Sequence, residues 1–509
     1  MRVPAAARLF AIFGCIAVAE IQERVIEQPL DHFSGVSAGP WFWQRYYVDN
    51  QYYRADGPIL LYSVGERTAQ ASDLSNGFIG DLAKETGGLV VLLEQRFYGN
   101  SVPDFNGTNV WQYLTVEQMM ADIRRFSEHI DHVILEWTTL TRHRRTRTSM
   151  PLVLVGGSFA GSLMVWTRQR YPDLKALAVA SSAPLSVVDG YWEFDKMVAQ
   201  RLPCAKTLSL AVCTVDRVLD SGDAARINEL KRQFGLDYAK NVVDIVTALT
   251  IQVSSLMQAP ADEQSRVSIA AYCSQLERSD MTGVEALALM TREYGQRHRL
   301  VSISECPQRS DNLAWLWQQC TELGMWQTAP QVNSSSAEEA AWFSRRLRSR
   351  RLDVRHYKQQ CDKCFPLSVG ESTQFRAFSK KTLNALMHQV PSDVLLTAGE
   401  LDPWFGLTAV GRGVRVADNA MVVRNASHAE DLLSSETEDG IVVNPGVLVA
   451  RKRIVEAVQQ WSLKNRRIFR NGDNPSPASS NVSLLLDSRG LRIGAALVVF
   501  CVLFAKYVL

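Results

Sequence analysis

Short apolar runs alternate with amphipathic stretches over the first part of the chain. Four runs are almost entirely apolar, and they lie at Ile59 to Val64, Leu89 to Glu94, Leu152 to Val155 and Ala176 to Ala180. Runs of this kind are typical of strands that are buried on both faces of a sheet. Between the second and third runs, Thr115 and Gln118 open a long amphipathic stretch, which predicts a helix that begins with a capping box. Strands that alternate with helices predict an α/β fold with a mostly parallel sheet.

The pattern changes at about Asp189. From there to about Val390 helical periodicity dominates, and then Val394 to Gly399 again has the composition of a buried strand. A chain of 509 residues is also too long for one simple core. We therefore predict a sheet unit formed by residues 20–188 and 393–470, interrupted by a helical cap at 189–392 that has the size of a small domain.

Both ends of the chain have the composition of targeting segments. Residues 1–19 combine an early arginine, a short apolar run and the small-residue sequence Ala17-Val18-Ala19, which predicts a secretory signal peptide. Residues 471–509 form a polar linker that leads into an almost wholly apolar tail from Ile493 to Leu509. This tail predicts membrane attachment, either as a short span or as the removable signal for a glycolipid anchor.

The cysteines and the glycosylation sequons agree with a secreted protein. Seven cysteines lie between the signal and the tail, an odd number that predicts structural disulfides and one free thiol. Cys361 and Cys364 form a Cys-x-x-Cys pair without a second pair of ligands, so we expect disulfides there and no metal. Sequons for N-glycosylation occur at Asn106, Asn333, Asn425 and Asn481. We expect a lysosomal or vacuolar, extracellular or surface-anchored protein.

The charge of the chain argues against a nucleic-acid partner. The formal net charge is only +2. The basic clusters at 142–147 and 345–351 lack the interleaved aromatic residues of a nucleic-acid surface, so we interpret them as solvated loops. We expect no cofactor, and the oligomeric state stays open.

Ser158 stands at a sharp junction between a predicted strand and a predicted helix. Gly156 and Gly157 precede it, and Ala160 and Gly161 follow it, so small residues flank the serine on both sides. The pattern approximates the G-x-S-x-G nucleophile elbow, in which a strained turn exposes the serine hydroxyl at the carboxyl edge of the sheet. Ala160 stands where the strict pattern has glycine. A glycine-rich turn with an incidental serine is the alternative.

A serine nucleophile needs a histidine base and an acid that orients it. On a hydrolase sheet the chain order is serine, acid, histidine. His428 follows the Val394 strand, and Asp402 comes directly after that strand, so we predict Asp402 as the acid and His428 as the base. Asp418 and Glu400 are competitors for the acid.

Several longer motifs resemble the family of lysosomal Pro-X carboxypeptidase, dipeptidyl peptidase II and thymus-specific serine protease, and the thymus-specific branch is the most similar. The motifs are Glu27 to Phe33, Glu94 to Gly99, Gly156 to Leu163, Val179 to Pro184, Cys320 to Glu322, Leu401 to Trp404 and Ser427 to Asp431. The resemblance covers residues from about 25 to 465 and implies an α/β-hydrolase fold with a helical cap. It also implies Ser158 as nucleophile, Asp402 as acid and His428 as base, in agreement with the chain order.

The resemblance also has departures. Gln95 stands where the family usually has histidine, and Ser162 replaces a methionine of some members. We expect the oxyanion to be held by the backbone N–H of Phe159 and one from the loop at Gly65. Trp404 is a candidate wall for a proline-sized pocket, with Ser162 making that pocket roomier, although core packing would explain a tryptophan equally well.

The sequence therefore predicts a serine exopeptidase that hydrolyses short peptides, next to proline, through an acyl-enzyme. Removal of one C-terminal residue and removal of an N-terminal dipeptide stay open as alternatives. Two other classes also stay open, because the same elbow serves esterases and lipases and because the fold could belong to a catalytically weak surface protein.

Overall fold

The centre of the molecule is an eight-stranded sheet in the order β1-β2-β4-β3-β5-β6-β7-β8. The computed structural model describes residues 21–35, 39–54, 57–75, 77–104, 110–130, 150–237, 241–259, 263–298, 306–307, 310–365, 380–387, 390–414, 419–433 and 444–470. The strands are Gln22–Pro29 (β1), Trp41–Asp49 (β2), Ile59–Ser63 (β3), Leu89–Leu93 (β4), Leu152–Gly157 (β5), Ala176–Ser181 (β6), Val394–Gly399 (β7) and Ala420–Val423 (β8). β1 and β2 are antiparallel additions, and all pairings from β4 to β8 are parallel. The predicted mostly parallel sheet is confirmed.

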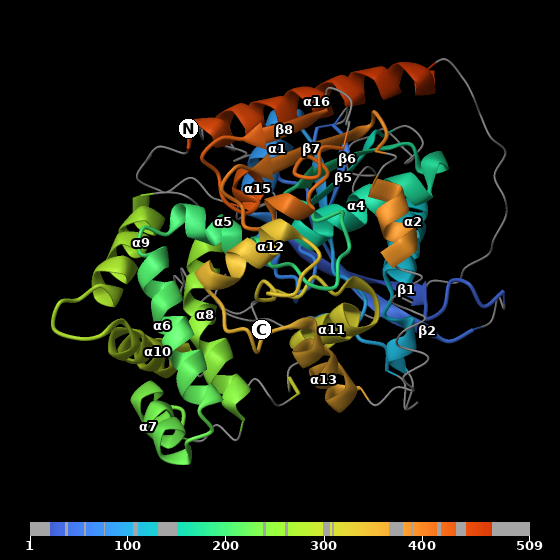
Figure 1. Ribbon diagram of the computed structural model, residues 1–509. Helices are drawn as coiled ribbons and strands as arrows, with labels where there is room; N and C mark the ends of the chain where they lie inside the picture. Colours follow the sequence, from blue (N-terminus) through green and yellow to red (C-terminus); the bar gives the residue numbers. More distant parts are fainter. Residues whose placement is uncertain are drawn as a thin grey trace, which may run out of the picture.

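Helices cover both faces of this sheet (Figure 1). One face carries Phe78–Thr86 (α1), Glu430–Leu433 (α15) and Pro445–Arg470 (α16), and the other carries Val116–His129 (α2) and Ser158–Arg170 (α4). Alternate side chains of β5 serve the two layers, because Leu154 packs in the cluster of α2 and α4 while Val155 packs in the cluster of α1 and α16. A strand covered on both sides is apolar at every position, which explains its continuous apolar run.

The predicted start of α2 is confirmed, but its capping box is only half formed. The Thr115 hydroxyl accepts a hydrogen bond from the Gln118 backbone N–H at 3.1 Å. The Gln118 side chain does not return to Thr115 and instead donates to Asp31 at 2.6 Å and accepts the His32 N–H at 2.9 Å. The residue that would complete the cap therefore fixes the segment that follows β1.

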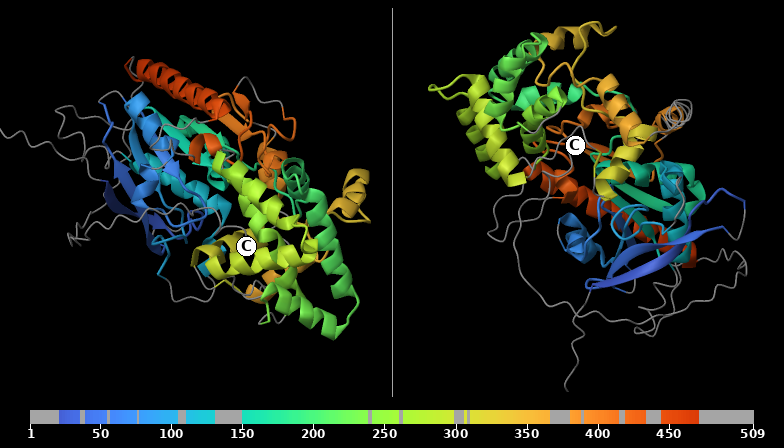
Figure 2. Two further views of the ribbon diagram at one scale, coloured as in Figure 1. Left: turned by 90° about the vertical axis from the view of Figure 1, so that its left-hand side faces the viewer. Right: turned by 90° about the horizontal axis from the view of Figure 1, so that it is seen from below.

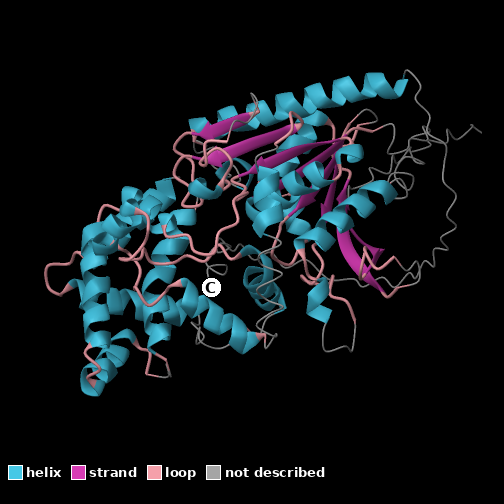
Figure 3. Ribbon diagram, turned by 45° about the vertical axis from the view of Figure 1, so that its right-hand side comes forward, coloured by secondary structure: helices cyan, strands magenta, loops and turns pink. Residues whose placement is uncertain are grey.

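The helices between β6 and β7 lie within the predicted insertion, and the last helical residues before β7 are 380–387. Those before residue 380 are Glu193–Arg201 (α5), Ala205–Asp220 (α6), Ala224–Phe234 (α7), Val242–Gln258 (α8), Glu263–Leu276 (α9), Gly283–His298 (α10), Ser310–Gln318 (α11), Ala337–Trp342 (α12) and Val354–Cys364 (α13), with a π-helical turn at Gln319–Leu323 (η6). Short 3-10 helices occur at Ala71–Leu74, Val110–Tyr113, Pro172–Leu174, Phe343–Arg345 and Phe405–Leu407. Figures 2 and 3 show α6 to α10 as a helical group to one side of the strands. The division into folding units at 189 and 392 stays a prediction.

The later part of the insertion is bound tightly to the sheet unit. The Asp311 carboxylate on α11 accepts hydrogen bonds from the backbone and hydroxyl of Thr68, at 2.9 and 2.6 Å. The Glu322 carboxylate in η6 accepts the Val116 N–H at 2.7 Å and so caps α2. Because Glu322 accepts this N–H, the first turn of α2 is capped even though the Gln118 side chain is bonded elsewhere.

Three disulfides join Cys204 to Cys273, Cys306 to Cys364 and Cys320 to Cys361. Within the described residues Cys213 is the free thiol. The predicted structural disulfides and single free thiol are confirmed, and the two cysteines of the Cys-x-x-Cys pair go to different partners. Three disulfides fit a protein of the secretory pathway.

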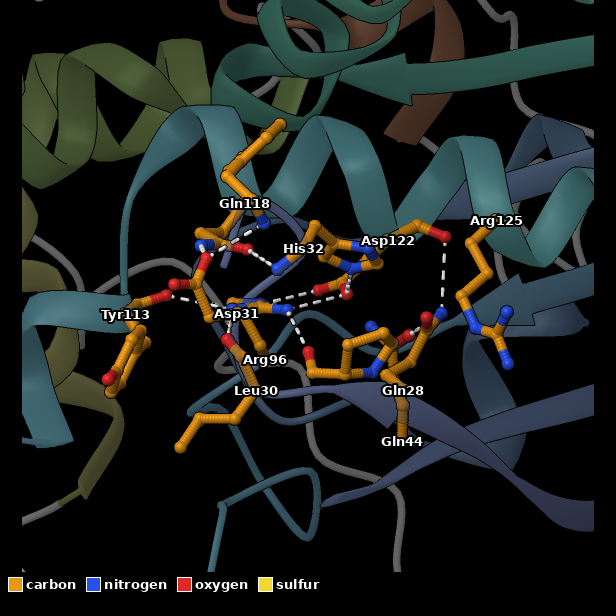
Figure 4. A network of polar contacts seen from close by, with 12 residues as sticks. Gln28, Leu30, Asp31, His32, Gln44, Arg96, Tyr113, Gln118, Asp122 and Arg125 are labelled. Atoms are coloured by element: carbon orange, nitrogen blue, oxygen red, sulfur yellow. Dashed lines mark hydrogen bonds and ion pairs between the residues drawn. The ribbon is translucent and has the colours of Figure 1, made fainter. Parts of the chain in front are cut away.

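The N-terminal ribbon of β1 and β2 is fixed by a buried polar network (Figure 4). Arg96 donates to the Asp122 carboxylate from Nε at 2.6 Å and from Nη2 at 2.7 Å, and His32 Nε2 lies 2.7 Å from Asp122 Oδ1. Arg96 also donates to the carbonyls of Pro29 and Leu30, at the end of β1. The ribbon is therefore anchored to α2 through a charged pair.

The two predicted targeting segments lie outside the described residues. No helix in the described part of the chain combines the length and hydrophobicity that a membrane span requires.

Candidate active site

The predicted strand-to-helix turn at Ser158 is confirmed. β5 ends at Gly157 and α4 begins at Ser158, whose φ of 54° is in the left-handed region that side chains rarely adopt. A Cβ added at Gly156 would lie only 2.6 Å from the backbone of Ala160, so the close approach of strand and helix requires glycine there. Strain of this kind is found where a nucleophile must be presented at the edge of a sheet.

Asp402 and His428 lie in direct contact. His428 Nδ1 lies 2.9 Å from both carboxylate oxygens of Asp402, and both side chains are buried. Burial opposes the charged imidazole, but the charge and hydrogen bond of Asp402 outweigh it, so the pKa of His428 is raised. Of the competing acids, Glu400 accepts the Asn425 N–H at 2.9 Å, and Asp418 lies outside the described residues.

The histidine loop lies against the serine elbow. A Cβ added at Gly157 would lie 3.3 Å from Cβ of Ala429, so the residues next to Ser158 and His428 are in contact. Ala429 has a φ of 49°, and its N–H donates to the Ser182 hydroxyl at 3.0 Å. Ser182 itself has a φ of 48° and also accepts the Gly399 N–H at 3.4 Å. One hydroxyl thus joins the histidine loop to the end of β7, which leads into Asp402.

The buried carboxyl of Asp431 stabilises this junction through hydrogen bonds to β6 and β7. Asp431 accepts hydrogen bonds from the hydroxyls of Ser181 and of Thr397, the latter at 2.6 Å. Burial raises the pKa of Asp431, against the opposing effect of the two hydroxyls. No role for Ser182 or Asp431 could be predicted from sequence, because their partners come from strands far apart in the chain.

Arg201 connects the cap to both loops of the acid and the base. From the end of α5 its Nη1 donates to the carbonyls of Met257 and Leu401, at 2.6 and 2.9 Å, and to the Ser427 hydroxyl at 3.1 Å. Burial lowers the pKa of Arg201, although the charges of Glu430 and Asp402 oppose this. Leu401 and Ser427 directly precede Asp402 and His428, so a cap residue fixes both.

The loop after β3 faces the elbow from the other side. Gly65 has a φ of 77°, and a Cβ added there would lie 3.3 Å from the backbone nitrogen of Ala160. The Gly65 N–H donates to the Ser63 hydroxyl at 3.2 Å, and Gln95 donates to the same hydroxyl at 2.8 Å. The Gln95 side chain therefore stabilises this loop, while the Gly65 N–H is already used in a hydrogen bond within the loop. The next residue is Glu66, whose electrostatic interaction with His428 was not predicted from sequence.

Phe159 and Trp404 contact residues of the insertion. The Phe159 ring is buried and packs on Trp315 with a centroid distance of 5.2 Å. Trp404 is half-buried, stacks on Tyr191 at 5.6 Å, and donates from Nε1 to Gln258 at 2.7 Å. It therefore lies between the end of the sheet and the cap.

Ser162 lies one turn after Ser158 and has no exposed surface. Its hydroxyl donates to the Pro184 carbonyl at 3.0 Å. Nothing in this arrangement supports direct contact between Ser162 and a substrate.

Two of the four sequons can be located. Asn333 and Asn425 are exposed, whereas Asn106 and Asn481 lie outside the described residues. The described residues contain no cluster of side chains suited to holding a metal ion.

The fold and the site together define a class. A mostly parallel sheet that carries a strained serine elbow, followed along the chain by an acid in contact with a histidine, is an α/β-hydrolase. The chain belongs to the serine carboxypeptidase S28 family, which it matches over residues 28–454. It is therefore a serine-type peptidase, as the sequence predicted.

Individual relatives agree with this family. The thymus-specific serine proteases of Mus musculus and Homo sapiens are 28% and 29% identical to the chain, each over 472 residues that cover 86% of both proteins. The lysosomal Pro-X carboxypeptidase of Bos taurus is 25% identical over 482 residues, which cover 86% of this chain and 87% of that enzyme. The predicted family resemblance is confirmed.

Proposed function

We propose that the chain is a serine exopeptidase in which Ser158, His428 and Asp402 form the catalytic triad. The observation that carries the proposal is the contact of His428 with Asp402 beside the strained elbow of Ser158. A buried acid that holds Nδ1 leaves Nε2 of the imidazole to act on the serine hydroxyl.

In this mechanism His428 Nε2 removes the proton as Ser158 Oγ forms a bond to the substrate carbonyl carbon. The backbone N–H of Phe159 and one N–H from the loop at Gly65 stabilise the oxyanion. The imidazolium then gives its proton to the leaving nitrogen, the peptide bond breaks, and an acyl-enzyme forms. Water, deprotonated by His428, releases the acid and restores the Ser158 hydroxyl.

The proposed substrates are short peptides with proline on the acyl side of the cleaved bond. The cap supports a restriction to peptide ends, because helices joined to the triad loops through Arg201 leave a folded protein little access. Trp404 supports the preference for proline, because its half-buried ring at the boundary between sheet and cap offers a flat apolar wall. The name of the bovine relative, Pro-X carboxypeptidase, agrees with this preference.

A pooled-peptide digestion, read by mass spectrometry, tests the proposal. We expect cleavage at chain ends with enrichment of proline on the acyl side. Internal cuts in peptides with blocked termini, or no enrichment of proline, would contradict it. A fatty-acyl ester that is hydrolysed faster than any peptide would identify an esterase instead.

We also propose a lysosomal or extracellular destination, with glycans at the sequons and a membrane tether in the apolar tail. Three disulfides support the secretory route. Intact-mass detection of Leu509 in the mature protein would exclude a glycolipid anchor, and a peptide-N-glycosidase shift tests the glycans.

A further inference from the structure

Helix α11 of the insertion contacts both segments that would supply donors to the proposed oxyanion hole. Asp311 is bonded to the loop that follows β3, and Trp315 packs on Phe159, the residue directly after the elbow serine. Asp311 and Trp315 are four positions apart within α11, so their side chains lie on the same face of the helix. One helix face of the insertion therefore meets the loop and the elbow together.

The Asp311 carboxylate fixes the far end of the loop that follows β3. Its Oδ2 accepts the N–H and the hydroxyl of Thr68, at 2.9 and 2.6 Å, and its Oδ1 accepts the Gly99 N–H at 3.0 Å. The near end of the loop lies against the elbow, because a Cβ added at Gly65 would lie only 3.3 Å from the Ala160 nitrogen. The proposed loop donor belongs to this short segment, so its distance from the elbow depends on Asp311.

Trp315 holds the ring of Phe159 from the side of the insertion. The centroids of the two rings lie 5.2 Å apart at an interplanar angle of 57°, and Phe159 is buried whereas Trp315 is half-buried. Phe159 directly follows the strained Ser158 in the first turn of α4. Packing of the ring restricts rotation of the Phe159 backbone, and with it the direction of the N–H that would donate to the oxyanion.

Other residues of α11 attach the helix to the sheet unit. Nε1 of Trp317 donates to the Leu114 carbonyl at 3.1 Å, and Gln318 accepts a hydrogen bond from the Tyr98 hydroxyl at 2.5 Å. The turn that follows the helix is joined to α13 by the disulfide of Cys320. Substitutions at the contacts with the loop and the elbow should therefore leave α11 in place.

We propose that α11 positions the oxyanion hole, with Asp311 acting on the donor from the Gly65 loop and Trp315 acting on the Phe159 N–H. Both side chains act through other residues, so they are positioning residues. The inference rests on the proposed function, which supplies the oxyanion. Donors of this kind act mainly on the transition state, so their misplacement slows the chemical step more than it weakens the binding of substrate.

Paired esters test the inference. The two members of a pair share a prolyl acyl group and a leaving alcohol, and the carbonyl oxygen of one is replaced by sulfur in the other. Sulfur is larger than oxygen and accepts hydrogen bonds more weakly, so an oxyanion hole favours the oxygen ester. The quantity compared is the ratio of kcat/KM for the oxygen ester to that for the sulfur ester. Effects on His428 or on the fraction of folded enzyme cancel in this ratio, because both esters meet the same protein.

Asp311→Ala and Trp315→Leu should each lower this ratio roughly tenfold or more, as expected for misplaced donors. The conservative variants should retain most of it. Asp311→Asn keeps an oxygen that can accept both bonds from Thr68, and Trp315→Phe keeps an aromatic ring against Phe159. A general loss of stability would not be rescued in this way.

The matched control is Asp223→Ala, because Asp223 also accepts two backbone N–H groups, those of Ala225 and Arg226. It lies at the start of α7, away from the strands (Figure 1), and the ratio should stay at its wild-type value. Labelling of Ser158 by a fluorophosphonate identifies folded enzyme. If Asp311→Ala is not labelled, Thr68→Val takes its place, since it removes only the hydroxyl bond to Asp311 and should lower the ratio in part.

Four results would count against these proposals. An unchanged ratio in the Asp311 and Trp315 variants overturns the inference, even if both esters react more slowly. If only one of the two substitutions lowers the ratio, α11 does not serve both donors and the inference is wrong as stated. An equal fall in Asp223→Ala also overturns it. A wild type that hydrolyses the esters but no prolyl peptide contradicts the proposed substrate class instead, and the ester ratio still decides the role of α11.

Discussion

Ser158, Ser182 and Ala429 have left-handed backbone conformations although none is glycine. All three lie at the junction of the elbow with the histidine loop, where such strain is expected to serve catalysis. The small residues around Ser158 predicted the strained turn from sequence alone. The Ser182 contacts could not be predicted, because a serine at the end of an apolar run gives no signal of the amides that it will accept.

At the residue scale, Ser158→Ala and His428→Ala should each lower kcat by roughly 10⁴-fold or more. The double variant should be no worse than either single one, because members of a triad act as a unit. Steady-state kinetics on one prolyl peptide measures all three, with circular dichroism as the check on folding. Losses that multiply in the double variant would contradict the triad.

The raised pKa of His428 gives a second prediction at this scale. The base must be neutral, so activity should be lost as the pH falls through the His428 pKa, above the ordinary histidine value of about 6.5. Asp402→Asn removes the charge that favours the imidazolium and should move this acid limb to lower pH. It should also lower kcat by roughly 10⁴-fold, because the correct tautomer is no longer held. An acid limb that does not move would show that Asp402 does not act on His428.

At the scale of elements, the buried parallel strands were predicted well and three strands were missed. β3 to β7 are continuous apolar runs, which only strands covered on both faces need. β1 has one exposed face and one half-buried face, β2 buries Gln44 and Arg45 in polar contacts, and β8 has only 4 residues. Strands of this kind, at the edge of a sheet or next to it, carry little apolar signal, because their partners and not their own composition decide their burial.

The contact of α5 with the triad loops gives a prediction for this element. Arg201→Met should lower the free energy of unfolding by about 1–3 kcal/mol, because it leaves buried carbonyls without a donor. It should also lower kcat and move the acid limb upwards, since removing a cation near Asp402 favours the protonated imidazole. Urea denaturation and a pH profile measure both effects.

The matched control for Arg201 is Arg278→Met, which removes an exposed arginine of the cap that is paired with Asp280. We expect neither stability nor the pH profile to change beyond error. Equal effects of the two substitutions would mean that Arg201 does not position the loops.

At the scale of the whole molecule, the helical insertion was predictable and its attachment was not. The absence of strand-like runs predicted where the helices would come. Asp311 binds Thr68, and Glu322 binds the first turn of α2. Both contacts join residues more than 200 positions apart, so no local sequence pattern predicts them. For the same reason, the sequence could not predict which cysteines would pair with each other.

The N-terminal network predicts resistance of the whole fold to mild acid. Although burial opposes ionisation, the Arg96 charge lowers the pKa of Asp122, so the pair stabilises the folded state above the ordinary aspartate pKa of about 3.9. This contribution should be lost only as the pH falls below that value. Asp122→Asn should cost about 3–5 kcal/mol at neutral pH and flatten the acid dependence. Asp173→Asn, in an exposed pair with Arg124, is the control in urea melts at several pH values.

The disulfide between Cys320 and Cys361 connects the turn that caps α2 to helix α13 of the insertion. It closes a loop with a sequence separation of 41, and the entropy that it removes from the unfolded chain corresponds to about 4 kcal/mol. The double variant Cys320→Ser and Cys361→Ser should lose stability of that order in urea denaturation. It should also weaken the Glu322 cap, and amide exchange in the first turn of α2 should therefore increase. Cys213→Ser, at the free thiol, should change neither quantity, and equal losses in the two proteins would contradict this role of the disulfide.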